Sequence, residues 1–285
     1  MRESIIKMKK VFLLLFVLMA GGSLYSQQVA GAENGGMGLV SAGVDNFWSV
    51  YNNQAGMAYY NQTTVGLDYI NHFGMPELST KVIAATLPAL KGVFGISYSH
   101  IGMSVANQQT FGLAYAKRLG KRFAAGIKMN YVYSYQQGVY TDYGVLLFEA
   151  GLMAKPLKGL TVGAHVYNPS PVFLSEYSYR ELPVILRVGT QYEVSEKLNI
   201  ALEIYQSSFY KPQVMTGLEY SFEVLTARVG YATFSSLLAP WDVAHYGSFF
   251  FGTGFVFNDI HIDISTSMNQ YLGWSPQISM HYSFK

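Results

Sequence analysis

The feature that most constrains this chain is an alternation of apolar and polar residues, which recurs in segments of about ten residues over most of its length. In the last segment, Ile278, Met280 and Tyr282 share one face of an extended chain, whereas Ser279 and His281 share the other. A soluble sheet alternates too, but its polar face carries more Lys and Glu than these segments do. The pattern is typical of transmembrane β-barrel strands.

The amino-acid composition narrows the choice of fold. Hydrophobic residues make up 50% of the chain and charged residues 13%, about half of the ~25% charged residues of an average globular protein. Such a chain is either very deeply buried or lies against lipid. The longest apolar run outside the alternating segments, residues 11–20, is shorter than the ~20 residues of a membrane-spanning helix. Because backbone groups in hydrocarbon must be paired within the protein, a closed all-β barrel is expected.

The alternation predicts fourteen antiparallel strands, and an even number places both chain termini on one side of the membrane. Every second connection is tight, which is typical of periplasmic turns, while the two longest connections, about 169–181 and 234–245, fall on the opposite side. The predicted strands are 62–73, 79–88, 92–102, 107–118, 122–136, 142–154, 160–168, 182–194, 198–207, 212–222, 225–233, 246–257, 260–269 and 275–284. The barrel should therefore occupy residues 62–285.

Residues 1–26 read as an export signal. Four basic residues precede an apolar core, and small residues lead to Ser26, after which cleavage is expected. An uncleaved anchor is the alternative, although the apolar run is short for one. The prediction is a bacterial outer-membrane location reached through a cleaved signal peptide.

The charge balance and the lack of cysteine exclude several functions. Beyond residue 26 the chain holds 15 basic and 16 acidic residues, without a Lys/Arg cluster along the sequence, which argues against binding of nucleic acid or of an anionic surface. With no Cys, disulfide scaffolds, thiol nucleophiles and Cys-based metal sites are excluded.

Residues 27–61 do not alternate and are predicted to form a plug inside the barrel. Their first part is rich in glycine, and residues 47–58 read as a short helix closed by Gly56. The segment is too small for a domain, but its small residues would allow close backbone contact with a wall. The candidate plug residues are Gly36, Met37, Gly38, Asp45, Trp48, Asn53, Ala55 and Gly56.

Charged residues of both signs fall on the predicted inner face of the strands: Lys128, Glu149, Arg187, Glu203, Glu219, Arg228 and Asp263. Unpaired charges in a narrow barrel would be costly, so we expect a network among these residues and with the plug, where Glu33 or Asp45 are candidate partners. A solute path gated by these charges is the alternative.

No catalytic device or metal site is expected. His261, Asp263 and Ser265 lie two residues apart on one predicted strand, so their side chains are spaced by about 6.5 Å, whereas a catalytic triad needs hydrogen-bond contact. A polar stripe along the barrel interior is the better interpretation. The remaining histidines lack the spacing of metal ligands. We therefore expect a protein that is not an enzyme and needs no cofactor.

Several motifs resemble those of the FadL-like outer-membrane barrels, and of their smaller PorV/PorQ-like relatives. Residues 36–44 resemble the family's glycine-rich stretch, Asp45 its acidic residue, and residues 53–58 its "NPAGLA" box, with Gln54 in place of the proline. Further landmarks follow in the family's order at residues 142–145, 168–169, 182–189 and 227–231. The resemblance implies a fourteen-stranded barrel with an N-terminal plug, in the outer membrane of a Gram-negative bacterium.

Two functions fit this resemblance. Because roughly 16 residues are available per strand, the outer connections are too short for a large apolar capture site. The favoured hypothesis is therefore an accessory barrel that docks to other outer-membrane proteins of a secretion or assembly machine. The alternative is a transporter for hydrophobic compounds such as long-chain fatty acids. The candidate partner contacts, which could instead form a lid, are Val172, Phe173, Leu174, Leu237, Leu238 and Trp241.

Overall fold

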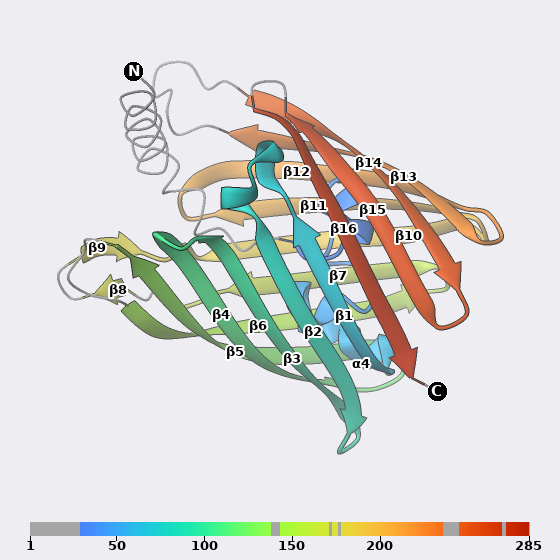
Figure 1. Ribbon diagram of the computed structural model, residues 1–285. Helices are drawn as coiled ribbons and strands as arrows, with labels where there is room; N and C mark the ends of the chain where they lie inside the picture. The colour runs from blue at the N-terminus through green and yellow to red at the C-terminus, as the bar shows by residue number, and fades with distance from the viewer. Residues whose placement is uncertain are drawn as a thin grey trace.

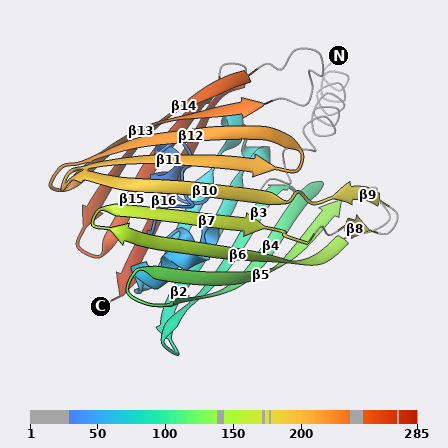
Figure 2. The ribbon, with the colours of Figure 1, turned by 180° about the vertical axis from the view of Figure 1, so that it is seen from behind.

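Fourteen antiparallel strands close into one barrel in the computed structural model (Figures 1 and 2). The structure describes residues 29–137, 143–170, 173–175, 178–235, 245–269 and 272–284. The predicted signal, residues 1–26, lies outside the described residues. The all-β closed barrel and the number of its strands, both predicted from the alternation, are confirmed.

Each predicted strand corresponds to one strand of the barrel, and all boundaries agree within three residues. The barrel strands are β1 (Thr63–Ile70), β2 (Thr80–Ala89), β3 (Gly92–Met103), β4 (Ala106–Arg118), β5 (Phe123–Gln136), β6 (Tyr143–Leu157), β7 (Leu160–Tyr167), β10 (Ile185–Ser195), β11 (Leu198–Ser207), β12 (Tyr210–Ser221), β13 (Leu225–Ser235), β14 (His245–Phe257), β15 (Ile260–Asn269) and β16 (Gly273–Phe284).

Two connections contain structure that the alternation did not predict. The first predicted strand stops early, at Ile70, and two short 3-10 helices follow, η2 (His72–Gly74) and η3 (Pro76–Leu78). Phe73 and Gly74 both have positive φ angles there, which ends the extended chain. The connection between β7 and β10 holds a separate hairpin of β8 (Phe173–Ser175) and β9 (Ser178–Glu181).

The two ends of the barrel differ. The connections β2–β3, β4–β5, β6–β7, β10–β11, β12–β13 and β14–β15 are short turns at one end, which we call the turn end. Strand β1 begins and β16 finishes at this end, where Thr63 lies opposite Phe284 in the register that closes the barrel. The opposite end, the loop end, carries η2, η3 and the β8–β9 hairpin.

The outer face of the barrel is apolar and the inner face polar, as the period of two requires. Along β16, Ile278 is 48% exposed and Met280 44%, whereas Ser279 between them is 1% exposed. This outer face suits contact with acyl chains, because the hydrogen-bonded strands leave their apolar side chains pointing outward.

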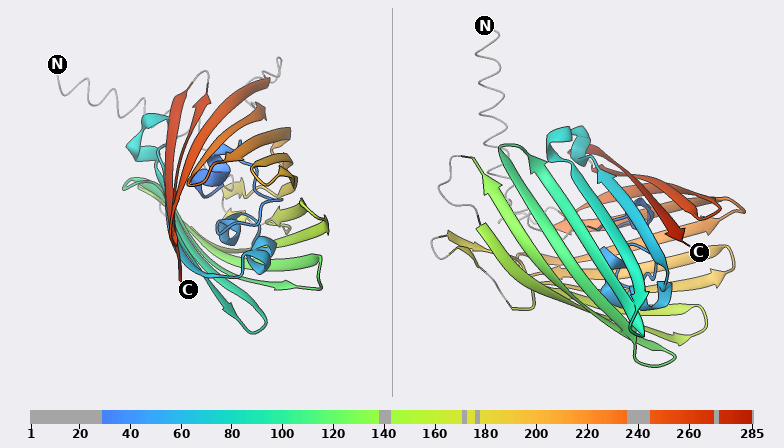
Figure 3. Two further views of the ribbon diagram at one scale, coloured as in Figure 1. Left: turned by 90° about the vertical axis from the view of Figure 1, so that its right-hand side faces the viewer. Right: turned by 60° about the horizontal axis from the view of Figure 1, so that its bottom comes forward.

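Residues 29–61, which we call the inner segment, fold inside the barrel (Figure 3). They form α2 (Ala32–Gly36), α3 (Ser49–Asn52), the 3-10 helix η1 (Gln54–Gly56) and α4 (Met57–Tyr60). The prediction that Gly56 closes a single helix is wrong. Gly56 has helical angles and leads directly into α4, while the break falls at Asn53, whose extended backbone separates α3 from η1.

No helix of the described residues is both long enough and apolar enough to cross a bilayer.

Trp48 and Phe47 of the inner segment are fully buried and pack edge to face, with ring centroids 4.9 Å apart. They belong to an apolar core that the inner segment shares with small wall residues, among them Ala84, Ala114 and Ala124. Small side chains on the wall leave the room that these two rings occupy.

Candidate functional site

Seven glycines on the inner face of the wall form a seat for the inner segment. Gly163 lies under the carbonyl of Ala42, and a Cβ on Gly189 would lie 3.2 Å from the nitrogen of Gly43. Without a side chain, these positions let two backbones touch directly. The glycine seat consists of Gly126, Gly151, Gly163, Gly189, Gly217, Gly230 and Gly252, on β5, β6, β7, β10, β12, β13 and β14.

Asn53 ties the inner segment together on this seat. Its side-chain nitrogen donates to the carbonyl of Ala42 at 2.6 Å, and its side-chain oxygen accepts from the nitrogen of Ala55 at 3.3 Å, capping η1. Asn53 is fully buried, and its side-chain oxygen would collide with a Cβ on Gly151. The same residue thus shapes the segment and fits it to β6.

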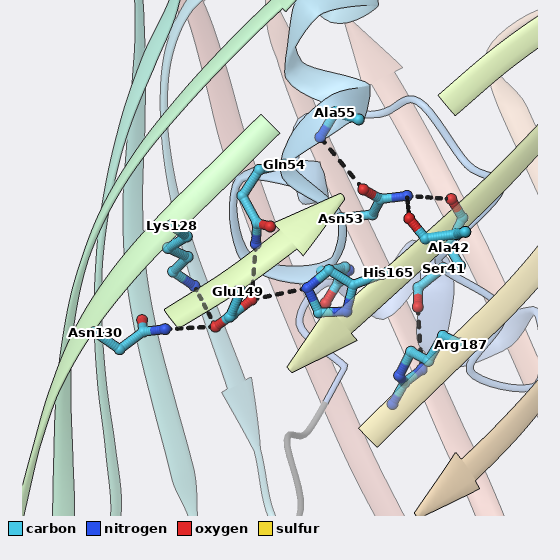
Figure 4. A network of polar contacts seen from close by, with 12 residues as sticks. Ser41, Ala42, Asn53, Gln54, Ala55, Lys128, Asn130, Glu149, His165 and Arg187 are labelled. Atoms are coloured by element: carbon cyan, nitrogen blue, oxygen red, sulfur yellow. Dashed lines mark hydrogen bonds and ion pairs between the residues drawn. The ribbon is translucent and has the colours of Figure 1, made fainter. Parts of the chain in front are cut away.

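Glu149 on β6 is the centre of one buried polar cluster (Figure 4). Its carboxylate accepts hydrogen bonds from Asn130 at 2.6 Å and from Gln54 of the inner segment at 2.9 Å. Lys128 lies 3.7 Å away, and the ring nitrogen Nε2 of His165 lies 2.9 Å away. Gln54, which stands where the resembled family has proline, therefore links the inner segment to a wall carboxylate.

A second buried cluster joins Glu203 on β11 to Arg187 on β10 and to the inner segment. One carboxylate oxygen accepts from Arg187 at 2.9 Å, and the other accepts from the backbone nitrogens of Ser41 and Ala42, both at 2.7 Å. Arg187 also donates to the hydroxyl of Ser41 at 3.1 Å. These contacts neutralise two buried charges and satisfy two backbone donors of a segment that has no sheet partner there.

Arg228 on β13 forms a third cluster with three carboxylates. It lies 2.7 Å from Glu219, 2.6 Å from Asp263 and 4.0 Å from Glu33 of α2. Burial raises the pKa of the Glu33 carboxyl to about 8, against the opposing effect of Arg228. The single guanidinium thus faces two wall carboxylates and a Glu33 carboxyl whose neutral form is favoured by burial.

The structure brings all seven inward charges of the sequence prediction into these three clusters. Of the two candidate partners on the inner segment, Glu33 approaches Arg228, whereas Asp45 pairs with Lys155 at 2.6 Å. Lys155 was not among the predicted residues. It follows the predicted end of its strand, and the structure extends β6 to Leu157.

On part of the barrel, the inner wall carries an apolar patch toward the loop end of the strands. Leu147 lies two residues beyond Glu149 on β6, and Ile185 lies two residues beyond Arg187 on β10, both almost fully buried. With residues from the other strands and the inner segment they form the loop-end cluster, which consists of Met37, Val40, Val44, Val132, Leu147, Tyr167, Leu182, Ile185, Ala201, Tyr205, Met215, Ala232 and Phe250.

The predicted plug residues take specific places. Gly36 lies against Gly252, Gly38 has a left-handed backbone and lies against β12 and β13, and Met37 is part of the loop-end cluster. Trp48, Ala55 and Gly56 are buried. Among the predicted partner or lid contacts, Phe173 and Leu174 belong to β8, while Val172, Leu237, Leu238 and Trp241 lie outside the described residues.

Sequence reasoning missed the glycine seat. The signal was present, because glycine recurs at inner-face positions of ten strands, yet alternation alone does not say on which of them another backbone will lie. It also missed Gln54, His165 and Ser41, whose importance depends on contacts between residues far apart in the chain.

The histidines form no metal site within the described part of the chain, where no group of three or more suitable ligands is present. His261 and His281 instead stack with ring centroids 4.4 Å apart, and Phe47 also stacks on His281, with ring centroids 5.2 Å apart. Asp263 is engaged by Arg228, so His261, Asp263 and Ser265 make no catalytic triad.

A closed antiparallel barrel with an apolar outer face and a folded N-terminal segment on its inner wall defines this chain as an outer-membrane type of β-barrel. Among solved structures, the same fold is found in a FadL homologue and in a hydrocarbon channel. No protein-family model and no curated protein matches the sequence.

Solved structures match over nearly the whole chain. The monoaromatic hydrocarbon channel CymD superposes with a TM-score of 0.68 at 11% identity, over 90% of this chain and 98% of that one. The toluene transporter TbuX of Ralstonia pickettii gives 0.67 at 11% identity, over 92% and 100%. A FadL homologue of Pseudomonas aeruginosa gives 0.60 at 14% identity, over 91% and 98%. At such identities the likeness establishes the fold.

Proposed function

We propose that this protein carries small hydrophobic compounds across the outer membrane, with the inner segment as its plug. The observation that carries the proposal is the loop-end cluster. The lumen of a water-filled barrel is polar, yet here the plug and the wall share an apolar cluster whose wall members include Leu147, Ile185, Met215 and Phe250. An apolar lining favours a solute that leaves water, as hydrophobic ligand sites do.

The domain organisation follows from the same proposal. Residues 1–26 are a cleaved export signal, residues 27–61 the plug, and residues 62–285 the barrel. The turn end faces the periplasm, because outer-membrane barrels place their short turns there. Most wall residues of the loop-end cluster then lie toward the outside of the cell, where an arriving compound would meet them before the glycine seat.

The solved structures of similar fold favour a transport function over the docking function that the sequence analysis preferred. They are described as a hydrocarbon channel, a toluene transporter and a FadL homologue. Hydrophobic compounds such as monoaromatic hydrocarbons or long-chain fatty acids are the substrate class that this likeness supports. The docking hypothesis relied on outer-loop residues, most of which lie outside the described part of the chain.

Uptake measurements test the proposal. The protein is expressed in a Gram-negative host that lacks transporters of this fold, and accumulation of radiolabelled toluene and oleate is followed. We expect uptake above that of the empty host, and a reduction of roughly tenfold in a Leu147→Thr/Ile185→Thr variant, because a hydroxyl at each position lowers the affinity of the lining for apolar solutes.

The matched control is Leu146→Thr/Leu186→Thr, which makes the same kind of change on the same two strands but on the lipid face, where Leu146 is 52% and Leu186 46% exposed. This variant should keep normal uptake. Uptake no higher than that of the empty host, with folded protein present in the membrane, would refute the transport function.

A further inference from the structure

Charge is distributed unevenly around the turn end. The turns β2–β3, β4–β5 and β6–β7 are neighbours in the barrel, and with the adjoining strand ends they carry seven basic residues and no acidic one. The other three turns carry four acidic residues and one lysine. The seven basic residues are Lys91, Lys117, Arg118, Lys121, Arg122, Lys155 and Lys158.

Two of the seven face the plug, and five do not. Lys155 pairs with Asp45, and the Nε of Arg118 donates to the carbonyl of Ala58 at 3.0 Å. The remaining five side chains are exposed, and no ion pair within the described residues involves them. We call these five the basic rim; its members are Lys91, Lys117, Lys121, Arg122 and Lys158.

Large apolar side chains stand beside these cations. Leu90 is 79% exposed, Leu119 67%, Phe123 61% and Leu157 67%. Cations next to exposed apolar groups at the edge of a barrel suit the membrane interface, where the apolar group meets acyl chains and the cation meets headgroup phosphate.

The tip of the β2–β3 turn supports the same conclusion. Leu90 and Lys91 have φ angles of 52° and 61°, a left-handed conformation in which glycine or asparagine is usual. The chain tolerates this backbone cost while keeping a bulky apolar and a cationic side chain at the tip. A backbone conformation of this cost is expected where the side chains of Leu90 and Lys91 take part in binding.

We propose that the basic rim binds the phosphate of anionic phospholipid headgroups in the inner leaflet of the outer membrane. Complementary charge and the adjacent apolar side chains together select an amphiphile with an acyl chain over a free anion. The inference rests on the proposed membrane location and orientation, but not on what the barrel transports. Contrary to the expectation from sequence, four of the seven basic residues do lie together, at residues 117–122, and the closed barrel brings the other two turns beside them.

Lipid retention by the purified full-length protein tests the inference. The protein is incorporated into nanodiscs of phosphatidylethanolamine and phosphatidylglycerol, re-extracted in a zwitterionic detergent, and the lipid that remains bound is quantified by mass spectrometry. The test variant is Lys91→Gln/Lys121→Gln/Lys158→Gln. The matched control is Lys81→Gln/Lys197→Gln/Lys211→Gln, which removes three exposed lysines elsewhere.

We expect wild type and control to retain phosphatidylglycerol in excess over phosphatidylethanolamine, and the test variant to lose that excess by roughly tenfold, since each interfacial lysine changes binding several-fold. Unchanged heat-modifiable mobility in gels shows that all variants are folded. Because toluene and oleate uptake is measured separately, failure of the transport function leaves this result intact.

Three outcomes would overturn the inference. Equal losses in both triple variants would show a general effect of charge. Equally strong displacement of the lipid by inorganic phosphate and by short-chain phosphatidylglycerol would identify a site for free anions. A protein that co-purifies in equal amounts with wild type and is lost from the test variant, with lipid retention unchanged, would assign the rim to a protein partner.

Discussion

At the scale of single residues, the contacts between plug and wall depend on a few buried groups that each serve several partners. Glu203 neutralises Arg187 and accepts from two backbone nitrogens of the plug. In Glu203→Gln, the guanidinium of Arg187 stays buried without its charged partner. We expect a loss of about 3–5 kcal/mol in the free energy of unfolding, measured by urea titration in detergent micelles.

A double variant tests whether the unpaired charge of Arg187 causes this loss. Arg187→Met combined with Glu203→Gln removes both charges, so the double variant should be more stable than Glu203→Gln alone. If the single variant unfolded at the urea concentration of wild type, the ion pair would not stabilise the fold.

Gly163 shows what the glycine seat does. A Cβ at this position would overlap the carbonyl of Ala42, which is backbone and cannot rotate away. We expect Gly163→Val to displace the plug, so that chymotrypsin cleaves near Phe47 and Trp48, which are fully buried in the native protein. Ala164→Val adds bulk to the neighbouring residue on the outer face of β7 and should leave the plug resistant. If both variants resisted chymotrypsin equally, contact between Gly163 and the plug would not be what holds the plug in place.

At the scale of elements, α2 is held by a carboxyl whose ionisation changes near neutral pH. Burial raises the pKa of Glu33 to about 8 from an ordinary value of 4.5, while Arg228 opposes the shift and Asp263 and Glu219 add to it. A raised carboxyl pKa means that the stabilisation is complete below about pH 4.5 and is lost as the pH rises through 8.

The protein should therefore melt at a lower temperature at pH 9 than at pH 6. Glu33→Gln, which is neutral at both values, should show a smaller difference. A difference that persists in full in this variant would mean that other groups determine the pH dependence.

A covalent lock tests whether α2 must move during transport. A Cβ on Gly35 would lie 2.6 Å from the hydroxyl of Ser265 on β15, close enough for a disulfide after double substitution to cysteine. The chain has no cysteine of its own. Oxidation of Gly35→Cys/Ser265→Cys should stop oleate uptake, and reduction should restore it. The two single variants should not respond to oxidant, and unchanged uptake in the oxidised double variant would show that α2 stays in place.

Elements differ in how much of them can be predicted from sequence. Alternation predicts the barrel strands because lipid outside and protein inside impose opposite preferences on successive residues of every strand. The plug has no such constraint. Its helix break at Asn53, rather than at Gly56, follows from the side-chain contacts of Asn53 with Ala42 and Ala55. The inward charges could be predicted, but their partners could not, because pairing depends on the register of strands far apart in the chain.

At the scale of the whole molecule, stability depends on an unbroken apolar surface around the barrel. Ile278 lies midway along β16 on the lipid face. Ile278→Arg should cost about 2–4 kcal/mol in the free energy of folding into lipid vesicles, whereas Phe284→Arg, at the strand end near the interface, should cost about 0–1 kcal/mol. Urea titration in vesicles measures both. Similar costs at the two positions would argue that this face does not meet the hydrocarbon.

The pairing of β1 with β16 dictates an order of assembly. Only Asn61 and Gln62 separate α4, the last helix of the inner segment, from β1, so the two elements are synthesised one directly after the other. The wall around the inner segment is complete only when β16, twelve residues long, pairs with β1, the first strand of the barrel. An export intermediate without β16 would expose two bare sheet edges, with its inner segment open to the side.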